Sequence, residues 1–340
     1  MKISVFGAGS WGIAIAILLH GNGHNVTLWV KNAEFAAALR DTRENPRLPG
    51  AVIPDGVHIT SDTDIAAKGA EIAVFARPSQ STRETAEMFA GKLPRSCVAL
   101  CAAKGIEQDP PKLLSDVLLE VFGESQPVAV LSGPAHAEEV ARGGPTACVV
   151  ASHDKAAAEL VQDAFMSENF RVYTSDDIVG VQLGGSLKNI IALCAGICDG
   201  LGCGDNTVAA LATRGLTEIA QLATALGGRR ETVAGLAGLG DLIVTCTSRH
   251  SRNRRAGVLI GQGCSVSDAI NETGAAVEGY YTARAVRKIA GDLGVEMPIC
   301  MEAYSILFED KNPHEVIHQL MTRTKRSESG TEFDEDKTWK

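Results

Sequence analysis

The hydrophobic positions in the first half of the chain form short runs that alternate with stretches of helical spacing. The β-prone runs occupy residues 2–6, 26–30, 71–76, 97–101 and 128–131. Each run ends in small or polar residues, which is typical of strands whose carboxyl ends line a ligand crevice. The alternation predicts an α/β domain built on a doubly wound parallel sheet with helices on both faces.

Beyond about residue 180 the strand pattern fades, and helical stretches rich in small residues dominate. Residues 184–196 are apolar nearly all round, which indicates a buried helix. We therefore expect a first domain over residues 1–180 and an all-helical second domain over residues 181–325. The segment 326–340 is polar and is expected to be a disordered tail.

A glycine turn follows the first strand directly. Gly7, Gly9 and Gly12 form the pattern GxGxxG between this strand and an apolar helix. In that position Gly7 permits a tight turn, Gly9 lets the backbone approach a pyrophosphate, and Gly12 allows the helix to pack closely on the strand. The start of the helix offers unpaired N–H groups to the phosphates. The first domain is therefore predicted to be Rossmann-like and to bind a dinucleotide.

The end of the second strand bears on the choice of cofactor. NAD-binding domains usually place an acidic residue there to bind the ribose hydroxyls, whereas this chain has Lys31 with no carboxylate beside it. A basic residue suits the 2′-phosphate of NADP better than a bare ribose, and the alternative is a solvated surface lysine. The sequence thus predicts NADP or NAD as the cofactor.

Composition and charge narrow the class of partner. A length of 340 residues favours two domains, and a net charge of -9 argues against nucleic acid, which needs a basic surface. No apolar run approaches the roughly 18 residues of a membrane-spanning helix, so no transmembrane segment is expected. The N-terminus lacks the features of a signal peptide, and the nine cysteines include no CxxC pair. Free thiols in a reducing cytoplasm are the simplest interpretation.

Two lysines stand where chemistry is expected. Lys188 lies near the start of the buried helix, where a lysine is paired, reaches toward a cleft, or is functional. An ammonium group in a partly apolar site exchanges protons near neutral pH, so Lys188 is a candidate general acid or base. Lys104 follows the strand at 97–101 and is a candidate contact for substrate or phosphate.

A basic segment in the second half suggests a phosphate pocket. Ser251, Arg252 and Asn253 supply a hydroxyl, a planar guanidinium and an amide within one turn. The alternatives are a solvated face or a nucleic-acid-binding patch. The net negative charge of the chain and the absence of aromatic residues between the basic ones disfavour nucleic-acid binding. A small phosphorylated substrate is the expected partner.

The segment from His314 to His318 matches the zinc motif HExxH. A catalytic zinc ion would need a third ligand, and only the polar tail follows this segment. We instead expect an amphipathic helix that turns one apolar side inward, namely Val316, Ile317, Leu320 and Met321. No metal site is predicted.

Four segments together resemble one known family. They are GAGSWGIAIA from Gly7, SGPAHAEEVA from Ser132, GGSLKNIIALCAGICDGLGCGDNTVAALATRG from Gly184 and AGLAGLGDLIVTCTSRHSRNRRAG from Ala234. With Glu278 and Gly279 added, the chain is similar over roughly residues 1–320 to bacterial-type NAD(P)-dependent glycerol-3-phosphate dehydrogenases. The resemblance implies interconversion of dihydroxyacetone phosphate and sn-glycerol 3-phosphate, which feeds phospholipid synthesis.

The resemblance also implies roles for individual residues. Lys188 resembles the family's proton acceptor, and Lys104 is implied to lie near both substrate and cofactor. The implied substrate contacts are Lys104, Gly133, Ala135, Lys188, Asp241, Ser251, Arg252 and Asn253. The implied cofactor contacts, together with the glycine turn, are Gly7, Gly9, Ser10, Trp11, Gly12, Lys31, Lys104, Ala137, Arg252, Ala276 and Glu278.

The chain departs from the family pattern at one place, where Ala135 and His136 replace a hydroxyl residue and an aromatic residue. A side-chain hydroxyl contact is therefore lost at Ala135, while backbone contacts are retained. Two other functions stay open: a related two-domain β-hydroxyacid dehydrogenase or ketopantoate-type reductase, and a nucleotide-sensing protein without turnover. A homodimer is compatible with each of these interpretations.

Overall fold

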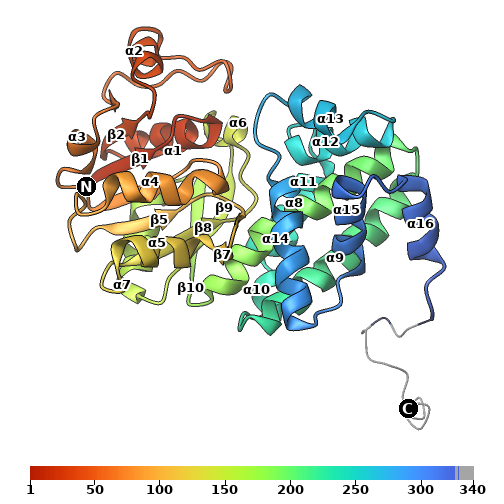
Figure 1. Cartoon of the computed structure of the whole chain (residues 1–340). Coiled ribbons are helices and arrows are strands. Elements are labelled where there is room, and N and C mark those ends of the chain that lie inside the picture. Colours follow the sequence, from red (N-terminus) through yellow and green to blue (C-terminus); the bar gives the residue numbers. More distant parts are fainter. Residues whose placement is uncertain (326–327, 329–340) are drawn as a thin grey trace.

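Eight strands form one sheet in the N-terminal half of the molecule, and helices make up the C-terminal half (Figure 1). This computed structural model describes residues 1–325 and residue 328, so the predicted tail lies almost entirely outside the described residues. Across the sheet the strands are β10 (Phe170–Ser175), β9 (Thr146–Ala151), β8 (Val128–Ser132), β5 (Val98–Cys101), β4 (Ile72–Phe75), β1 (Lys2–Phe6), β2 (Asn25–Trp29) and β3 (His58–Thr60).

The predicted α/β fold is confirmed, with one correction to the sheet. All neighbouring strands are parallel except β8 and β9, which run antiparallel. The connection after β8 contains only the short helix α6 (Ala137–Val140), which does not carry the chain back across the sheet. Because a parallel connection needs a long crossover, β9 enters the sheet from the edge where β8 ends.

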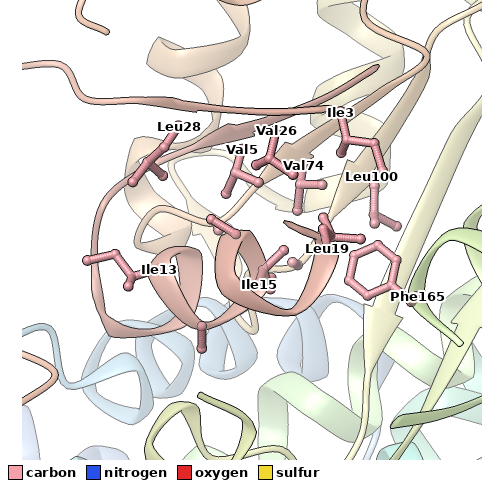
Figure 2. Close-up of a cluster of buried hydrophobic side chains, with 14 of the residues drawn as sticks. Ile3, Val5, Ile13, Ile15, Leu19, Val26, Leu28, Val74, Leu100 and Phe165 are labelled. Carbon is pink, nitrogen blue, oxygen red and sulfur yellow. The ribbon is translucent and has the colours of Figure 1, made fainter. Parts of the chain in front are cut away.

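Helices cover both faces of the sheet and bury its side chains. One face packs on α1 (Ser10–Gly21), as Figure 2 shows, and on α7 (Lys155–Phe165). The other face packs on α4 (Thr82–Phe89) and α5 (Leu114–Phe122). The remaining elements of this half are α2 (Ala33–Thr42), α3 (Thr63–Ala67), the single turn η1 (Ser79–Ser81) and the hairpin β6 (Ile106–Gln108) and β7 (Pro111–Leu113).

The C-terminal half is built around one long helix, α8 (Ile178–Gly200), which begins just before the expected boundary at residue 181. Around it lie α9 (Asp205–Ala225), α10 (Arg230–Val233), the π-helical turn η2 (Leu236–Gly240), α11 (Asp241–Thr247), α12 (Arg252–Gly261), α13 (Val266–Glu272), α14 (Glu278–Leu293), α15 (Pro298–Phe308) and α16 (Pro313–Met321). The division of the chain into two domains stays a prediction.

The expectation about apolar runs needs correction at α8. This helix is long and apolar enough to cross a membrane by length and composition, but 94% of its most apolar window is buried inside the protein. Glycine, serine and the single Lys188 interrupt the apolar run without making the helix polar as a whole. Such a helix forms the core of the C-terminal half, where its apolar surface meets other helices.

Glycines bring α8 and α12 unusually close together. A Cβ atom at Gly196 would lie 2.0 Å from the backbone oxygen of Arg254, and one at Gly257 would lie 2.1 Å from the oxygen of Leu193. Gly200 and Gly261 make equivalent contacts one turn further along. Small residues four apart on two helices allow their backbones to touch, so this contact fixes α12 against α8.

The HExxH segment lies on α16, as the amphipathic pattern predicts. Val316 is buried, whereas His314 and His318 are exposed. The prediction that Met321 faces inward is wrong, because this side chain is 80% exposed at the end of the helix. Within the described residues, no cluster of three or more His, Cys, Asp or Glu side chains could hold a metal ion.

Candidate active site

The glycine turn after β1 has the geometry that a dinucleotide loop requires. Gly7 has a φ of +122°, a backbone conformation that residues other than glycine rarely adopt. A Cβ atom at Gly12 would lie 1.9 Å from the backbone oxygen of Gly7, so only glycine lets α1 pack this closely on the turn. Gly9, in contrast, has open space around the position of a Cβ atom.

The start of α1 fits the pyrophosphate of a dinucleotide. Gly9 is the N-cap residue of this helix, and no described side chain caps the first turn. The N–H groups and the positive end of the helix dipole are therefore available to an anion. The open space beside Gly9 provides the room for it, so the residues present fit NAD or NADP.

Ser10 and Trp11 hold neighbouring loops against this turn. The Ser10 hydroxyl donates to the backbone oxygen of Arg47 at 2.6 Å, and the Trp11 indole N–H donates to the oxygen of Ala102 at 3.2 Å. Both side-chain donors are therefore occupied within the protein.

A carboxylate from a distant helix lies beside Lys31, although none neighbours it in the sequence. The Lys31 ammonium donates to the carboxylate of Glu84, which comes from α4. Arg77 lies 3.6 Å from the same carboxylate, and its stem approaches Gly7. The Lys31 ammonium holds the pKa of Glu84 below its usual range. Two cations around one anion leave this end of the crevice net positive.

A buried carboxylate joins the two candidate lysines. Asp241 begins α11 and is 1% exposed. Its Oδ1 accepts from the Lys188 Nζ at 2.5 Å, and its Oδ2 accepts from the Lys104 Nζ at 2.8 Å. Lys188 also donates to the Thr245 hydroxyl at 2.7 Å, and Lys104 donates to the Gly133 oxygen at 2.7 Å. The two ammonium groups and one carboxylate carry a net charge of +1.

Burial sets the protonation of Lys188. The loss of water around the ammonium lowers the pKa of Lys188 to about 8, and the positive charge of Lys104 acts in the same direction. Asp241 opposes both effects, because its negative charge favours the protonated form. Lys188 can therefore both give and take a proton close to neutral pH, as a general acid or base must.

A pair of asparagines ties the lysine helix to α12. The Asn189 amide donates to the backbone oxygen of Lys104 at 3.1 Å, and its oxygen accepts from the Asn253 amide at 2.9 Å. The Asn253 oxygen in turn accepts from the N–H of Gly279 at 2.8 Å. Asn253, predicted as a phosphate contact, is therefore mainly occupied in joining α8, α12 and α14.

Arg252 is the exposed cation at the start of α12. Its neighbour Ser251 is the N-cap, whose hydroxyl accepts from the N–H of Arg254 at 3.2 Å. Arg254 pairs with Asp199 at 2.6 Å, which commits its guanidinium to the α8–α12 contact. Arg252 is near enough to Glu278 to act on its carboxyl electrostatically.

Glu278 spans the interface between the two halves of the molecule. Its carboxylate accepts from the N–H of Ser79 at 3.0 Å and from the Ser79 hydroxyl. Burial raises the pKa of Glu278, and the hydrogen bonds from Ser79 oppose that rise. Ala276 lines a nearby surface hollow together with Pro78. Glu278 therefore links the loop after β4 to α14.

The loop after β8 brings a histidine to the lysine cluster. Gly133 and Ala135 precede His136, and Ala137 is buried at the start of α6. Burial lowers the pKa of His136, and the positive charge of Lys188 adds to this effect. His136 departs from the family pattern in the sequence, which indicates no role for it. Its buried Nε2 has no hydrogen-bond partner among the described residues.

A dinucleotide loop that meets a lysine general acid or base at the carboxyl ends of a mostly parallel sheet defines the class of NAD(P)-dependent oxidoreductases. A profile described as NAD-dependent glycerol-3-phosphate dehydrogenase N-terminus matches residues 2–158, and the corresponding C-terminus profile matches residues 177–318. The chain belongs to the NAD-dependent glycerol-3-phosphate dehydrogenase family.

Individual relatives agree with this assignment. Glycerol-3-phosphate dehydrogenase [NAD(P)+] of Thermoanaerobacter sp. (strain X514) is 53% identical over 328 residues, which cover 96% of this chain and 99% of the relative. The enzyme of the same name from Moorella thermoacetica is 50% identical over 328 residues, 96% of this chain and 97% of that relative. The crystal structure of glycerol-3-phosphate dehydrogenase from Coxiella burnetii has a TM-score of 0.91 at 36% identity, covering 95% of this chain and 99% of that one.

Proposed function

We propose that this protein interconverts dihydroxyacetone phosphate and sn-glycerol 3-phosphate with NAD or NADP, and so supplies glycerol 3-phosphate for phospholipid synthesis. The observation that carries the proposal is the cluster of Lys188, Asp241 and Lys104 in a chain that belongs to this family. When bound, the nicotinamide supplies the hydride for reduction of the ketone and accepts it in the reverse reaction.

Lys188 is the proton donor in the reducing direction and the proton acceptor in the oxidising direction. As the carbonyl oxygen of the substrate gains negative charge, the Lys188 ammonium stabilises that charge and then gives it a proton. Asp241 holds the ammonium in place at 2.5 Å and keeps it protonated in a site that otherwise disfavours charge. Lys104 adds a second positive charge, which offsets Asp241 and favours an anionic substrate.

Arg252 is proposed to bind the substrate phosphate, because a guanidinium matches phosphate oxygens in a planar fork. Ser251 and the first N–H groups of α12 complete the contacts. Changing Arg252 to Ala should lower kcat/KM for dihydroxyacetone phosphate at least about tenfold more than it lowers kcat/KM for unphosphorylated dihydroxyacetone. Arg255 to Ala, an exposed arginine on the same helix, is the matched control. If the two variants discriminate equally between dihydroxyacetone phosphate and dihydroxyacetone, the phosphate binds elsewhere.

Lys31 and Arg77 support use of NADP as well as NAD. The 2′-phosphate would meet two cations, while Glu84 between them offers a carboxylate to the ribose hydroxyls of NAD. The further proposed contacts with the cofactor come from the glycine turn, Lys104, Ala137, Arg252, Ala276 and Glu278.

A substrate panel tests the proposed reaction. Initial rates are measured by absorbance of the reduced nicotinamide with dihydroxyacetone phosphate, 2-ketopantoate and a short 3-oxoacid, each with NADH and NADPH. We expect kcat/KM to be highest for dihydroxyacetone phosphate by several orders of magnitude, because only that substrate offers a phosphate to Arg252. A preference for a carboxylate substrate would favour a β-hydroxyacid dehydrogenase or ketopantoate-type reductase. Cofactor binding without turnover of any substrate would favour a nucleotide-sensing protein.

We also expect the protein to act in the cytoplasm. All nine cysteines lie in the described part of the chain and are free thiols, as a reducing compartment favours. A homodimer stays a prediction, and sedimentation of the purified protein would test it.

A further inference from the structure

The carboxyl end of α8 brings two cysteines together. This helix ends in a Schellman motif, in which Gly202 has a φ of +73°. The N–H of Cys203 donates to the oxygen of Cys198 at 3.0 Å, and the N–H of Gly202 donates to the oxygen of Asp199 at 3.0 Å. In this motif the side chains at the two positions joined by the longer bond usually make an apolar contact. Here both positions are cysteines.

The two side chains lie near each other, since the Cys203 thiol contributes to the raised pKa of Cys198. They differ in exposure. Cys198 is 6% exposed, and its burial raises the pKa of this thiol to about 12. Cys203 is half-buried, and of the nine cysteines only Cys264 is comparably accessible. Cys203 can therefore meet a small reagent, while Cys198 lies behind it within reach.

We propose that Cys198 and Cys203 form a reversible disulfide at the end of α8 by exchange with a low-molecular-weight disulfide. The Cys203 sulfur attacks the reagent, forming a mixed disulfide and releasing one thiol. The Cys198 sulfur then attacks the Cys203 sulfur and releases the second thiol. Two protein thiols are oxidised, the reagent is reduced to two thiols, and the two protons leave with them.

A second helix in the same protein provides the comparison. Helix α12 ends in the same motif, with a φ of +94° at Gly263 and a bond from the N–H of Cys264 to the oxygen of Leu259 at 2.9 Å. Cys264 thus occupies the position of Cys203, but a leucine takes the place of Cys198. A reagent that attacks Cys264 forms a mixed disulfide that no neighbouring thiol in this motif resolves. Comparing Cys203 with Cys264 therefore distinguishes a thiol that is merely accessible from one that has a second thiol beside it.

The test uses the full chain with reduced glutathione and glutathione disulfide in a series of ratios. Non-reducing digestion and mass spectrometry identify the product at each cysteine. We expect oxidising ratios to link the Cys198 and Cys203 peptides, with a mass about 2 Da below the sum of the reduced peptides. Excess dithiol should restore both thiols, and Cys264 should carry glutathione under the same conditions.

Variants then assign the two steps. Cys198→Ser should leave glutathione attached to Cys203, and Cys203→Ser should leave Cys198 unmodified. Cys264→Ser should form the Cys198–Cys203 link as the unmodified protein does. The unmodified chain alone is sufficient to overturn the proposal. It does so if it keeps both thiols free at the most oxidising ratio, or if it retains glutathione on Cys203 without the link.

Discussion

Replacing Asp241 with Asn should move the pH dependence of the reaction toward lower pH. The carboxylate accepts from the Lys188 ammonium at 2.5 Å in a site that is almost fully buried. Two unit charges about 4 Å apart interact by about 4 kcal/mol at an effective dielectric constant near 20. Because about 1.4 kcal/mol corresponds to one pKa unit, losing even a third of that interaction would lower the pKa of Lys188 from about 8 to about 7.

The sign follows from the role of Lys188. Reduction needs the protonated amine, so kcat/KM for dihydroxyacetone phosphate should be level below the pKa and fall above it. In Asp241→Asn this fall should begin about one pH unit lower or more, and the rise in the oxidising direction should also move lower. Asp199→Asn makes the same change at a carboxylate that pairs with Arg254 instead, and it should leave both profiles in place. Unshifted profiles in Asp241→Asn would refute the assigned role of the carboxylate.

Three further perturbations test the packing, the cofactor end and a buried carboxyl. Gly257→Ala should lower Tm, since overpacking against Leu193 costs about 1–3 kcal/mol; Gly291→Ala, with open space around it, should raise Tm. Lys31→Asp should shift the kcat/KM ratio from NADPH toward NADH through repulsion of the 2′-phosphate. Glu218 caps α15, and burial raises its pKa to about 7. The folded protein therefore holds this proton more tightly than the unfolded chain does, so stability falls as pH rises from about 4.5, the ordinary pKa, toward 7 and then levels off. Glu218→Gln should flatten the fall of Tm over that range.

Each of these has a result that would contradict it. Equal Tm changes in the two glycine variants would mean that α8 and α12 can separate without cost. An unchanged cofactor ratio in Lys31→Asp would show that Lys31 does not meet the ribose. A Tm profile that is the same with Gln as with Glu at position 218 would show that this carboxyl does not titrate differently on unfolding.

The central strands and the dinucleotide loop could be predicted from the sequence because their signals are local. Buried parallel strands are continuous apolar runs, and GxGxxG follows the first of them within a few residues. The strands β3, β9 and β10 were not predicted. Of these, β3 and β10 lie at the two edges of the sheet, and the exposed face of β10 carries Arg171 and Tyr173. The antiparallel direction of β9 depends on how the connection between β8 and β9 folds. A local pattern of apolar residues does not predict that direction.

The site was predictable only in part for the same reason. Lys188 and Lys104 stand out locally, one in an apolar helix and the other after a strand. Their junction at Asp241 depends on three segments meeting in space, and Glu84 reaches Lys31 from a distant helix. The sequence indicated a phosphate contact at Asn253, which stays a prediction, but gave no signal for the hydrogen bonds of its amide to Asn189 and Gly279. The spacing of the glycines on α8 and α12 was a usable signal for the close helix contact.

The most direct test of the account compares the unmodified protein with Lys188→Ala. Absorbance of the reduced nicotinamide is followed after addition of dihydroxyacetone phosphate, the product is identified, and cofactor binding is measured separately by fluorescence. We expect the unmodified protein to form sn-glycerol 3-phosphate, and the variant to bind the cofactor but turn over at least about 10²-fold more slowly. An unmodified protein that forms no sn-glycerol 3-phosphate, or a variant with an undiminished rate, would contradict the account.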